Sequence, residues 1–236
     1  KGKGKDIDDF RRTNVNTAKI LLKILKNEDK IPSKFIYFST ISVYGERCSI
    51  EEYNENTELI PLSPYAVTKL ECENYLIKML DNKNLWILRP APVYSEQYFK
   101  NIDRRTKIKN IYYKVGDGNY HLSLCNLNNI VDLIIRIINN KIPYDTYNIS
   151  DEKHYTYNEL LKFKKASRSL KIPVFVIKIF YFIGKATKNV FLIENSIKLT
   201  SNNFFPSKKI QKFAKLKYIL AKWKLHETII CIFYFY

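Results

Sequence analysis

The chain has 236 residues, of which 46% are apolar and 27% charged, so it has enough apolar material for a packed core and is not a disordered chain. Its six glycines follow no regular period, which excludes a collagen-like protein. The chain has 40 Lys and Arg against 23 Asp and Glu, which gives a net charge of +17. This charge is expected both for a protein with an anionic partner and for a protein from a Lys-rich proteome, so it assigns no function by itself.

The pattern of apolar residues predicts helices that alternate with short strands over the first 150 residues. Apolar residues follow a helical spacing in residues 14–26, 65–80 and 128–138. Short β-favouring runs occur in residues 35–38, 86–88 and 147–149, and we expect the first two to be buried strands. Residues 46–58 and 104–109 are expected to form an acidic and a basic loop. This alternation indicates βαβ units and a parallel α/β sheet, which carries its sites where the strands end.

The second part of the chain, after residue 150, reads as helices joined by basic segments, and we expect a smaller lobe there. Its most apolar stretch, residues 174–183, is predicted to be a buried helix, with a helix on a membrane surface as the less favoured alternative. The closing residues 229–236 are apolar but too short to span a bilayer. The chain starts with Lys1, so we expect the sequence to begin inside a longer reading frame.

The cysteines and histidines are scattered along the chain. No cysteine pair among Cys48, Cys72, Cys125 and Cys231 has the spacing of a zinc knuckle or a redox dithiol. We therefore expect reduced thiols in a cytoplasmic protein. The three histidines form no paired-ligand motif, and no metal site is predicted.

One segment combines a strand end with a helix start in a pattern that suits acid–base chemistry. Thr40 closes the first expected strand, and Tyr65 begins the next helix after Ser63 and Pro64. Tyr65 and Lys69 are four residues apart and share a helix face, so the ammonium is expected to lower the pKa of the phenol. A hydroxyl at the strand end could then share a substrate oxygen with that phenol.

Spacing alone does not identify this site. The chain has three Tyr–Lys pairs at this spacing, Tyr65/Lys69, Tyr181/Lys185 and Tyr218/Lys222, about as many as chance gives. Only the first follows a Ser-Thr strand end and a Ser-Pro helix start, so the other two are interpreted as solvated or packing pairs.

With this context the chain resembles the extended short-chain dehydrogenase/reductase family, in particular its nucleotide-sugar epimerases and dehydratases. Val43-Tyr44-Gly45 matches the end of the family's strand signature, and Glu73 matches the Glu after its Tyr-x-x-x-Lys. Leu88-Arg89-Pro90 and Asn148-Ile149-Ser150 are similar to its later strands, and residues 199–212 and 225–229 to its tail. The resemblance spans nearly the whole chain.

The resemblance implies an α/β fold: a partial Rossmann-like, doubly wound parallel sheet that lacks the first βαβ units, with a smaller C-terminal substrate lobe. Residues 1–97 with 120–150 would form the rest of the NAD-binding domain, and residues 98–119 with 151–236 the substrate lobe and tail. NAD is the implied cofactor, and NADP is not excluded. The catalytic residues would be Thr40, Tyr65 and Lys69. The cofactor would be bound by Asn14, Thr40, Tyr65, Lys69, Pro90 and Ala91.

The chain also departs from the family pattern. None of its glycines forms the family's Gly-rich strand–turn–helix for the cofactor pyrophosphate. Ile41 and Ser42 stand where dehydratases of the family carry Asp-Glu, which argues against a 4,6-dehydratase. Pro92 replaces an Asn that touches the nucleotide-sugar. The Arg expected before the third helix is missing, which leaves His121 as the nearest cation, or Arg104, Arg105 and Lys114 as substitutes.

These features predict an NAD-dependent epimerase of the UDP-hexose 4-epimerase type. Two alternatives stay open: an NAD(P)H-dependent keto-sugar reductase with the same three residues, and a truncated, non-catalytic remnant without the dinucleotide phosphate site. The expected partners are a nucleotide-sugar and a second copy of the chain, joined through the helices that carry Lys19 and Tyr65. Nucleic-acid binding is not predicted, because no recognised module is present.

Overall fold

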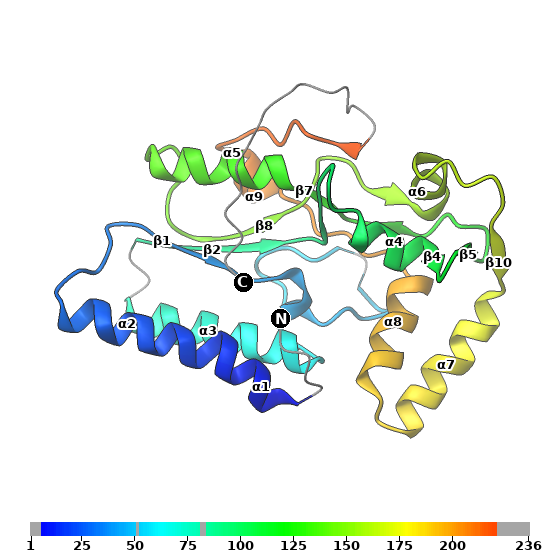
Figure 1. The fold of residues 1–236 in the computed structure, drawn as a ribbon, viewed down its shortest axis with the longest axis horizontal. Helices are drawn as coiled ribbons and strands as arrows, with labels where there is room; N and C mark the ends of the chain where they lie inside the picture. Colours follow the sequence, from blue (N-terminus) through cyan, green and yellow to red (C-terminus); the bar gives the residue numbers. More distant parts are fainter. Residues whose placement is uncertain (1–5, 51, 81–83, 221–236) are drawn as a thin grey trace.

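The computed structural model describes residues 6–50, 52–80 and 84–220 (Figure 1). Its central sheet has three parallel strands, in the order β1-β2-β8. They are β1 (Phe35–Phe38), β2 (Leu85–Pro90) and β8 (Thr146–Ile149). The register aligns Phe38 with Leu88 and Pro90 with Ile149, so the three strands end at one edge of the sheet. The predicted parallel α/β sheet is confirmed.

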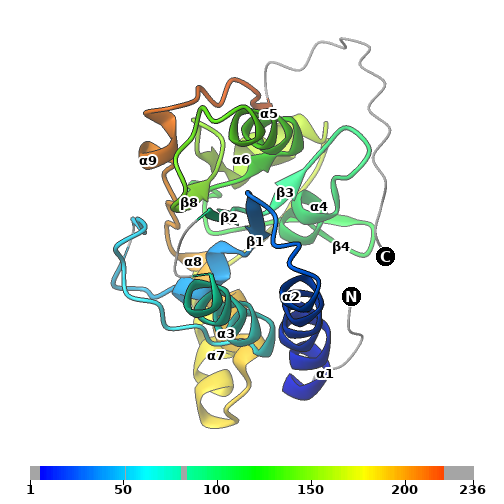
Figure 2. The same ribbon diagram turned by 90° about the vertical axis from the view of Figure 1, so that its left-hand side faces the viewer.

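Helices cover both faces of this sheet, as expected for a doubly wound fold (Figures 1 and 2). One face carries α5 (Leu127–Ile138), and the other carries α3 (Pro64–Met79) and α2 (Thr17–Asn27). Pro64 occupies the first position of α3, where its missing N–H costs nothing, and so fixes where this helix begins. The three predicted helices of this region and the three strands are all found, with ends that differ by a few residues.

The first helical segment is not uniform. The five residues of α1 (Ile7–Arg11) continue into a π-helical stretch, Arg12–Asn16, before α2 begins. Single π-helical turns inside α-helices are rare and occur frequently at functional sites. Asn14 lies in the middle of this stretch, beside α3.

The burial predicted for β1 is wrong. Phe35, Ile36 and Tyr37 are only half-buried, and Phe38 is 39% exposed. The reason is topological, since β1 pairs with β2 on one side and with no strand of the described residues on the other. By contrast, β2 lies between two strands, and its residues 85–89 are all buried, as predicted.

A second lobe lies beyond the carboxyl ends of the central strands. It contains a small sheet of three short strands in the order β10-β5-β4. These strands are β4 (Lys107–Ile108), β5 (Ile111–Val115) and β10 (Leu170–Ile172). Its helices are α4 (Lys100–Thr106), α6 (Tyr157–Phe163), α7 (Val174–Ala186) and α8 (Val190–Thr200). The parallel pairing of β5 with β10 joins the segment before residue 119 to the segment after residue 150. The predicted basic loop at 104–109 is wrong, because these residues end α4 and form the turn of a hairpin.

Shorter elements connect the two parts. The strands β3 (Val93–Tyr94) and β7 (Cys125–Asn126) pair in parallel, and β6 (His121–Leu122) pairs with β9 (Tyr155–Thr156). After α8, the chain returns to the first part, where α9 (Lys208–Gln211) lies beside β8 (Figure 1). The expectation for residues 229–236 falls outside the described residues.

The prediction that residues 174–183 are buried is wrong. They form α7 as expected, but only Ile177 and Gly184 of this helix are buried, and most of its large apolar side chains are exposed. Among the helices of the described ranges, none is long and apolar enough to cross a bilayer.

Candidate active site

Thr40 stands where β1 ends and the chain turns sharply away from the sheet. Its side chain accepts a hydrogen bond from the Ser42 backbone N–H at 3.2 Å and thereby caps a short 3-10 helix, Ile41–Tyr44. Gly45 closes the turn with a φ of +60°, and a Cβ at this position would collide with the backbone oxygen of Ile60. The Val-Tyr-Gly motif thus holds Thr40 at the sheet edge.

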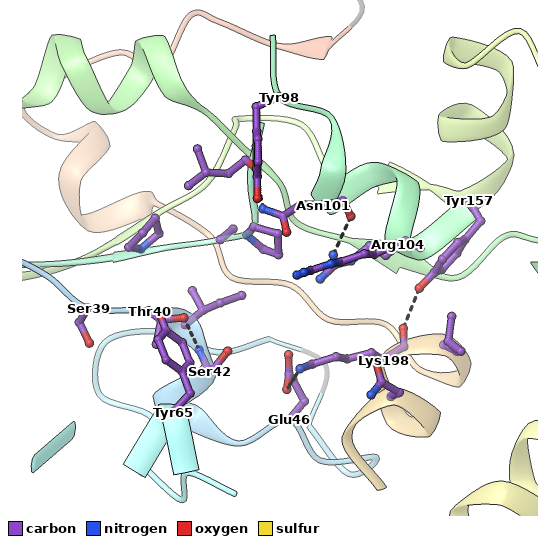
Figure 3. Close-up of a pocket in the computed structure, with 18 of the residues that line it drawn as sticks. Ser39, Thr40, Ser42, Glu46, Tyr65, Tyr98, Asn101, Arg104, Tyr157 and Lys198 are labelled. Carbon is purple, nitrogen blue, oxygen red and sulfur yellow. Dashed lines mark hydrogen bonds and ion pairs between the residues drawn. The ribbon is translucent and has the colours of Figure 1, made fainter. Parts of the chain in front are cut away.

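Tyr65 lies in the first turn of α3 and points toward Thr40 (Figure 3). Both side chains line the same wall of the pocket described below. Phe10 packs edge-to-face on the Tyr65 ring at a centroid distance of 6.0 Å and fixes its orientation. Although the side chain is 38% exposed overall, burial raises the pKa of Tyr65, and the neighbouring Thr40 hydroxyl offsets part of this increase.

Lys69 lies one helical turn after Tyr65, but its ammonium group points to the strand. Its Nζ donates a 2.8 Å hydrogen bond to the Phe38 backbone oxygen and lies 4.9 Å from the centre of the Tyr37 ring. Burial lowers the pKa of Lys69. The expected lowering of the phenol pKa by this ammonium is wrong for the structure, since Lys69 is not among the groups that shift the pKa of Tyr65.

Asn14 contacts the same turn of α3 from the π-helical stretch. Its Nδ2 donates to Thr68 Oγ1 at 3.0 Å, and Thr68 Oγ1 donates to the Tyr65 backbone oxygen at 3.1 Å. Asn14 is therefore tied to the helix between Tyr65 and Lys69. Neither Asn14 nor Lys69 lines the pocket described next, whereas Thr40, Tyr65, Pro90 and Ala91 all do.

The pocket has a volume of about 460 Å³ and lies between the sheet edge and the second lobe (Figure 3). One wall consists of the ends of β1 and β2 with Tyr65. The opposite wall comes from the second lobe and includes Asn101, Arg104, Arg105, Tyr113, Tyr157 and Lys198. Ligands of open α/β sheets bind at this edge, where the strands end.

Arg104 and Arg105 lie on α4 and line the pocket, although sequence reasoning favoured a solvated loop. Arg105 donates to the Asn101 backbone oxygen at 2.8 Å, while the Arg104 guanidinium forms no hydrogen bond or ion pair within the described residues. The other two candidate cations lie elsewhere. His121 packs against Phe204, and Lys114 donates to Asn158 at 2.9 Å.

Two buried polar side chains of the pocket each have an oxygen atom that forms no hydrogen bond within the described residues. Ser39 Oγ is buried and has no hydrogen-bond partner within the described residues. Glu46 is 5% exposed, and its Oε2 forms an ion pair with Lys198 Nζ at 3.5 Å but accepts no hydrogen bond from the part of the chain that the structure describes. Because buried polar atoms without partners are costly, this pattern favours a polar ligand.

Glu46, Asn101 and Lys198 are site residues that sequence reasoning missed. Glu46 follows directly after Val43-Tyr44-Gly45, and this position was the available signal. Lys198 is brought to the pocket by α8 from about 150 residues away, at a place that no local pattern marks.

The residues present fit one half of a dinucleotide cofactor. The unpartnered Ser39 hydroxyl, Thr40 and the Tyr65 phenol offer hydroxyl groups at the sheet edge, and Lys69 lies behind them. No Gly-rich turn joins a strand to a helix within residues 6–50, 52–80 and 84–220. Over the same ranges, no three His, Cys, Asp or Glu side chains are grouped as metal ligands.

Comparison with known proteins agrees with this geometry. No curated protein sequence matches the chain at a significant level. Among solved structures, the UDP-glucuronic acid 4-epimerase from Bacillus cereus in complex with NAD is 25% identical, with a TM-score of 0.61 over 72% of this chain. The dTDP-glucose 4,6-dehydratase from Bacillus anthracis is 16% identical, with a TM-score of 0.63 over 92% of this chain, and shows the same fold.

The chain spans 57% of the length of the first of these structures and 66% of the second. The sequence profile of the NAD dependent epimerase/dehydratase family matches residues 2–150, more than half of the chain. The predicted family is confirmed, and the chain belongs to the NAD dependent epimerase/dehydratase family.

Proposed function

We propose that this protein is an NAD-dependent 4-epimerase that acts on a nucleotide-activated hexose. The observation that carries the proposal is the placement of Tyr65 beside Thr40 at the wall of a pocket that the second lobe closes (Figure 3). The likeness to a solved UDP-glucuronic acid 4-epimerase adds support. Thr40, Tyr65 and Lys69 would be the catalytic residues.

NAD would be held by Asn14, Thr40, Tyr65, Lys69, Pro90 and Ala91. Bound there, NAD would supply reversible hydride transfer at carbon 4 of the sugar. The ammonium of Lys69 would exchange its contact with the Phe38 oxygen for a hydroxyl of the cofactor ribose. Ser39 Oγ, which has no partner within the described residues, would accept or donate a further hydrogen bond there.

The protein's own residues would handle the proton. Tyr65 in its phenolate form accepts the proton of the sugar 4-hydroxyl, and Thr40 donates a hydrogen bond to the same sugar oxygen. On the return step Tyr65 gives the proton back. The raised pKa of Tyr65 makes it a strong base once it is ionised, because a group with a high pKa holds a proton firmly.

The opposite wall of the pocket would hold the nucleotide-sugar. Arg104 offers a guanidinium with no partner in the described part of the chain, which suits the diphosphate. Glu46 and Lys198 would bind sugar hydroxyl groups, with the carboxylate as acceptor and the ammonium as donor. His121 is not part of this proposal, since it lies against Phe204 outside the pocket.

Two residues of the pocket argue against a dehydratase. Ile41 and Ser42 both line it, beside Thr40, and neither can exchange protons around sugar carbons 5 and 6. A homodimer through α2 and α3 stays a prediction, supported by the exposure of Ile20, Leu21 and Ile24 on α2.

Product analysis of the purified protein with a panel of UDP- and dTDP-hexoses tests the proposal. We expect the 4-epimer to form without net consumption of NAD. Stoichiometric consumption of NADPH would contradict epimerisation and indicate a keto-sugar reductase. A protein that binds no NAD would indicate a non-catalytic remnant.

A further inference from the structure

The α7–α8 hairpin exposes more large apolar side chains than any helix packed on the central sheet. It projects from the second lobe, away from that sheet (Figure 1). Phe182 is 67% exposed and Phe191, just after the turn, is 71% exposed. Phe175, Ile179 and Ile183 are exposed as well. Large exposed apolar patches on a folded protein mark contact sites.

Four of the exposed apolar side chains of α7 form one stripe, and exposed Phe180 lies outside it. Phe175, Ile179, Phe182 and Ile183 follow the i, i+4, i+7, i+8 spacing that places residues on one face of a helix. The buried residues Ile177 and Gly184 lie on the other face. A Cβ on Gly184 would come within 2.9 Å of Leu192 Cβ, so α7 and α8 pack closely along that face. The apolar stripe is therefore left over after the hairpin has formed its own core.

The charge around the stripe has a single sign. Residues 160–193 contain eight Lys and Arg and no Asp or Glu. Lys178, Lys185 and Lys188 are exposed on the hairpin. The first acidic residue after this range, Glu194, is half-buried and lies 3.5 Å from Lys198. Exposed aromatic residues flanked by lysines are typical of helices that lie in the interface of an anionic membrane, where lysine stems cover apolar surface and ammonium groups reach the headgroups.

We propose that the α7–α8 hairpin docks the protein on an anionic phospholipid surface. Phe175, Phe182 and Phe191 enter the boundary between headgroups and acyl chains, and Lys178, Lys185 and Lys188 bind lipid phosphates. Docking of this kind is peripheral and reversible, and it is independent of the proposed enzymatic function.

Sedimentation with sucrose-loaded vesicles tests the proposal on the whole chain. Vesicles of phosphatidylcholine with about one third phosphatidylglycerol should bind the protein at least tenfold more tightly than pure phosphatidylcholine vesicles. The difference should shrink at high salt, which screens the charges. Equal binding to both kinds of vesicle, or none to either, would overturn the proposal.

Two variants test the apolar and the basic side chains of the hairpin separately. Phe182→Ser with Phe191→Ser should lower vesicle binding at least tenfold, because two exposed aromatic rings can no longer insert. Lys178→Gln with Lys185→Gln and Lys188→Gln should lower binding to the anionic vesicles roughly a hundredfold, about fivefold for each lysine. Ile138→Ser, at an exposed position on α5 on the other side of the molecule, is the matched control and should bind like the parent.

Urea denaturation of each variant checks that the fold persists, and all these positions are exposed. Unchanged vesicle binding by either hairpin variant would overturn the proposal. A second copy of the chain is the competing occupant of the patch. If the phenylalanine variant turned a dimer into a monomer in the absence of lipid, the patch would be a protein interface and membrane docking would be refuted.

Discussion

Arg89 of β2 donates two hydrogen bonds to the carboxylate of Glu73 on α3, at 2.6 and 3.1 Å, and both side chains are buried. Arg89 also donates to the Tyr44 hydroxyl at 3.0 Å, which in turn donates to Asn148 Oδ1 at 2.8 Å. This network joins β2, β8 and the turn after β1 to the helix that carries Tyr65. These four residues match the family pattern but do not belong to the proposed catalytic set. Their network fixes α3 relative to the edge of the central sheet.

Removal of Arg89 should destabilise the protein strongly. Arg89→Met leaves the Glu73 carboxylate buried without its partner, and we expect a loss of about 3–5 kcal/mol in the free energy of unfolding, measured with urea. The double variant Arg89→Met with Glu73→Leu should recover most of the loss. Lys153→Met is the control, because it breaks an exposed ion pair with Glu159 and should cost less than about 1 kcal/mol. A small effect of Arg89→Met would contradict the structural role of the pair.

Replacement of Arg104 should weaken substrate binding. Arg104→Gln removes the cation that we assign to the diphosphate, so KM for the nucleotide-sugar should rise by about tenfold to a hundredfold, the equivalent of one charge-assisted hydrogen bond. The turnover rate should change little, because the guanidinium does not touch the reacting carbon. Lys100→Gln, an exposed position on the same helix outside the pocket, serves as the control. An unchanged KM would assign the phosphates to another part of the site.

Replacement of Lys69 should lower both cofactor affinity and rate. Lys69→Ala removes the ammonium that we assign to the cofactor ribose, and we expect weaker NAD binding by calorimetry together with slower turnover. Lys78→Ala, near the end of the same helix, controls for the loss of a lysine. A slower rate with unchanged NAD affinity would show that the ribose contact is misassigned.

The reaction should become faster as the pH rises. Only unprotonated Tyr65 can accept the proton of the sugar hydroxyl, and burial raises the pKa of its phenol, so the ionised fraction is small at neutral pH and grows with pH. We therefore expect kcat to increase from neutral into alkaline solution. Thr40→Val should move this limb to higher pH, because the neighbouring Thr40 hydroxyl lowers the pKa of Tyr65. A rate independent of pH over this range would contradict the role of Tyr65.

The elements of the sheet domain could be predicted from the sequence because local signals agree there. Pro64 marks the start of α3, and the apolar run of β2 reflects its central position in the sheet. The side-by-side placement of Thr40 and Tyr65 followed from the rule that parallel strands end at one edge, combined with the family resemblance. These inferences depend on short-range patterns and on topology.

Other features depend on long-range packing and were missed. The half-burial of β1 follows from its edge position, which its own four residues do not encode. The exposure of α7 follows because only one of its faces packs, on α8 and on Tyr113 and Val115 of β5, and apolar composition does not distinguish a buried helix from one that faces outward. The direction of the Lys69 ammonium depends on the Phe38 carbonyl, and Lys198 reaches the pocket only through the fold of the second lobe.

The most direct test of the account is turnover by the Tyr65→Phe variant. This change removes one hydroxyl group and keeps the ring that packs against Phe10, so the fold should be preserved and NAD binding should largely survive through the other five cofactor residues. Loss of the acid–base group should lower kcat by at least about a hundredfold, measured by formation of the 4-epimer. Turnover equal to that of the parent protein would contradict the assignment of Tyr65 as the catalytic base.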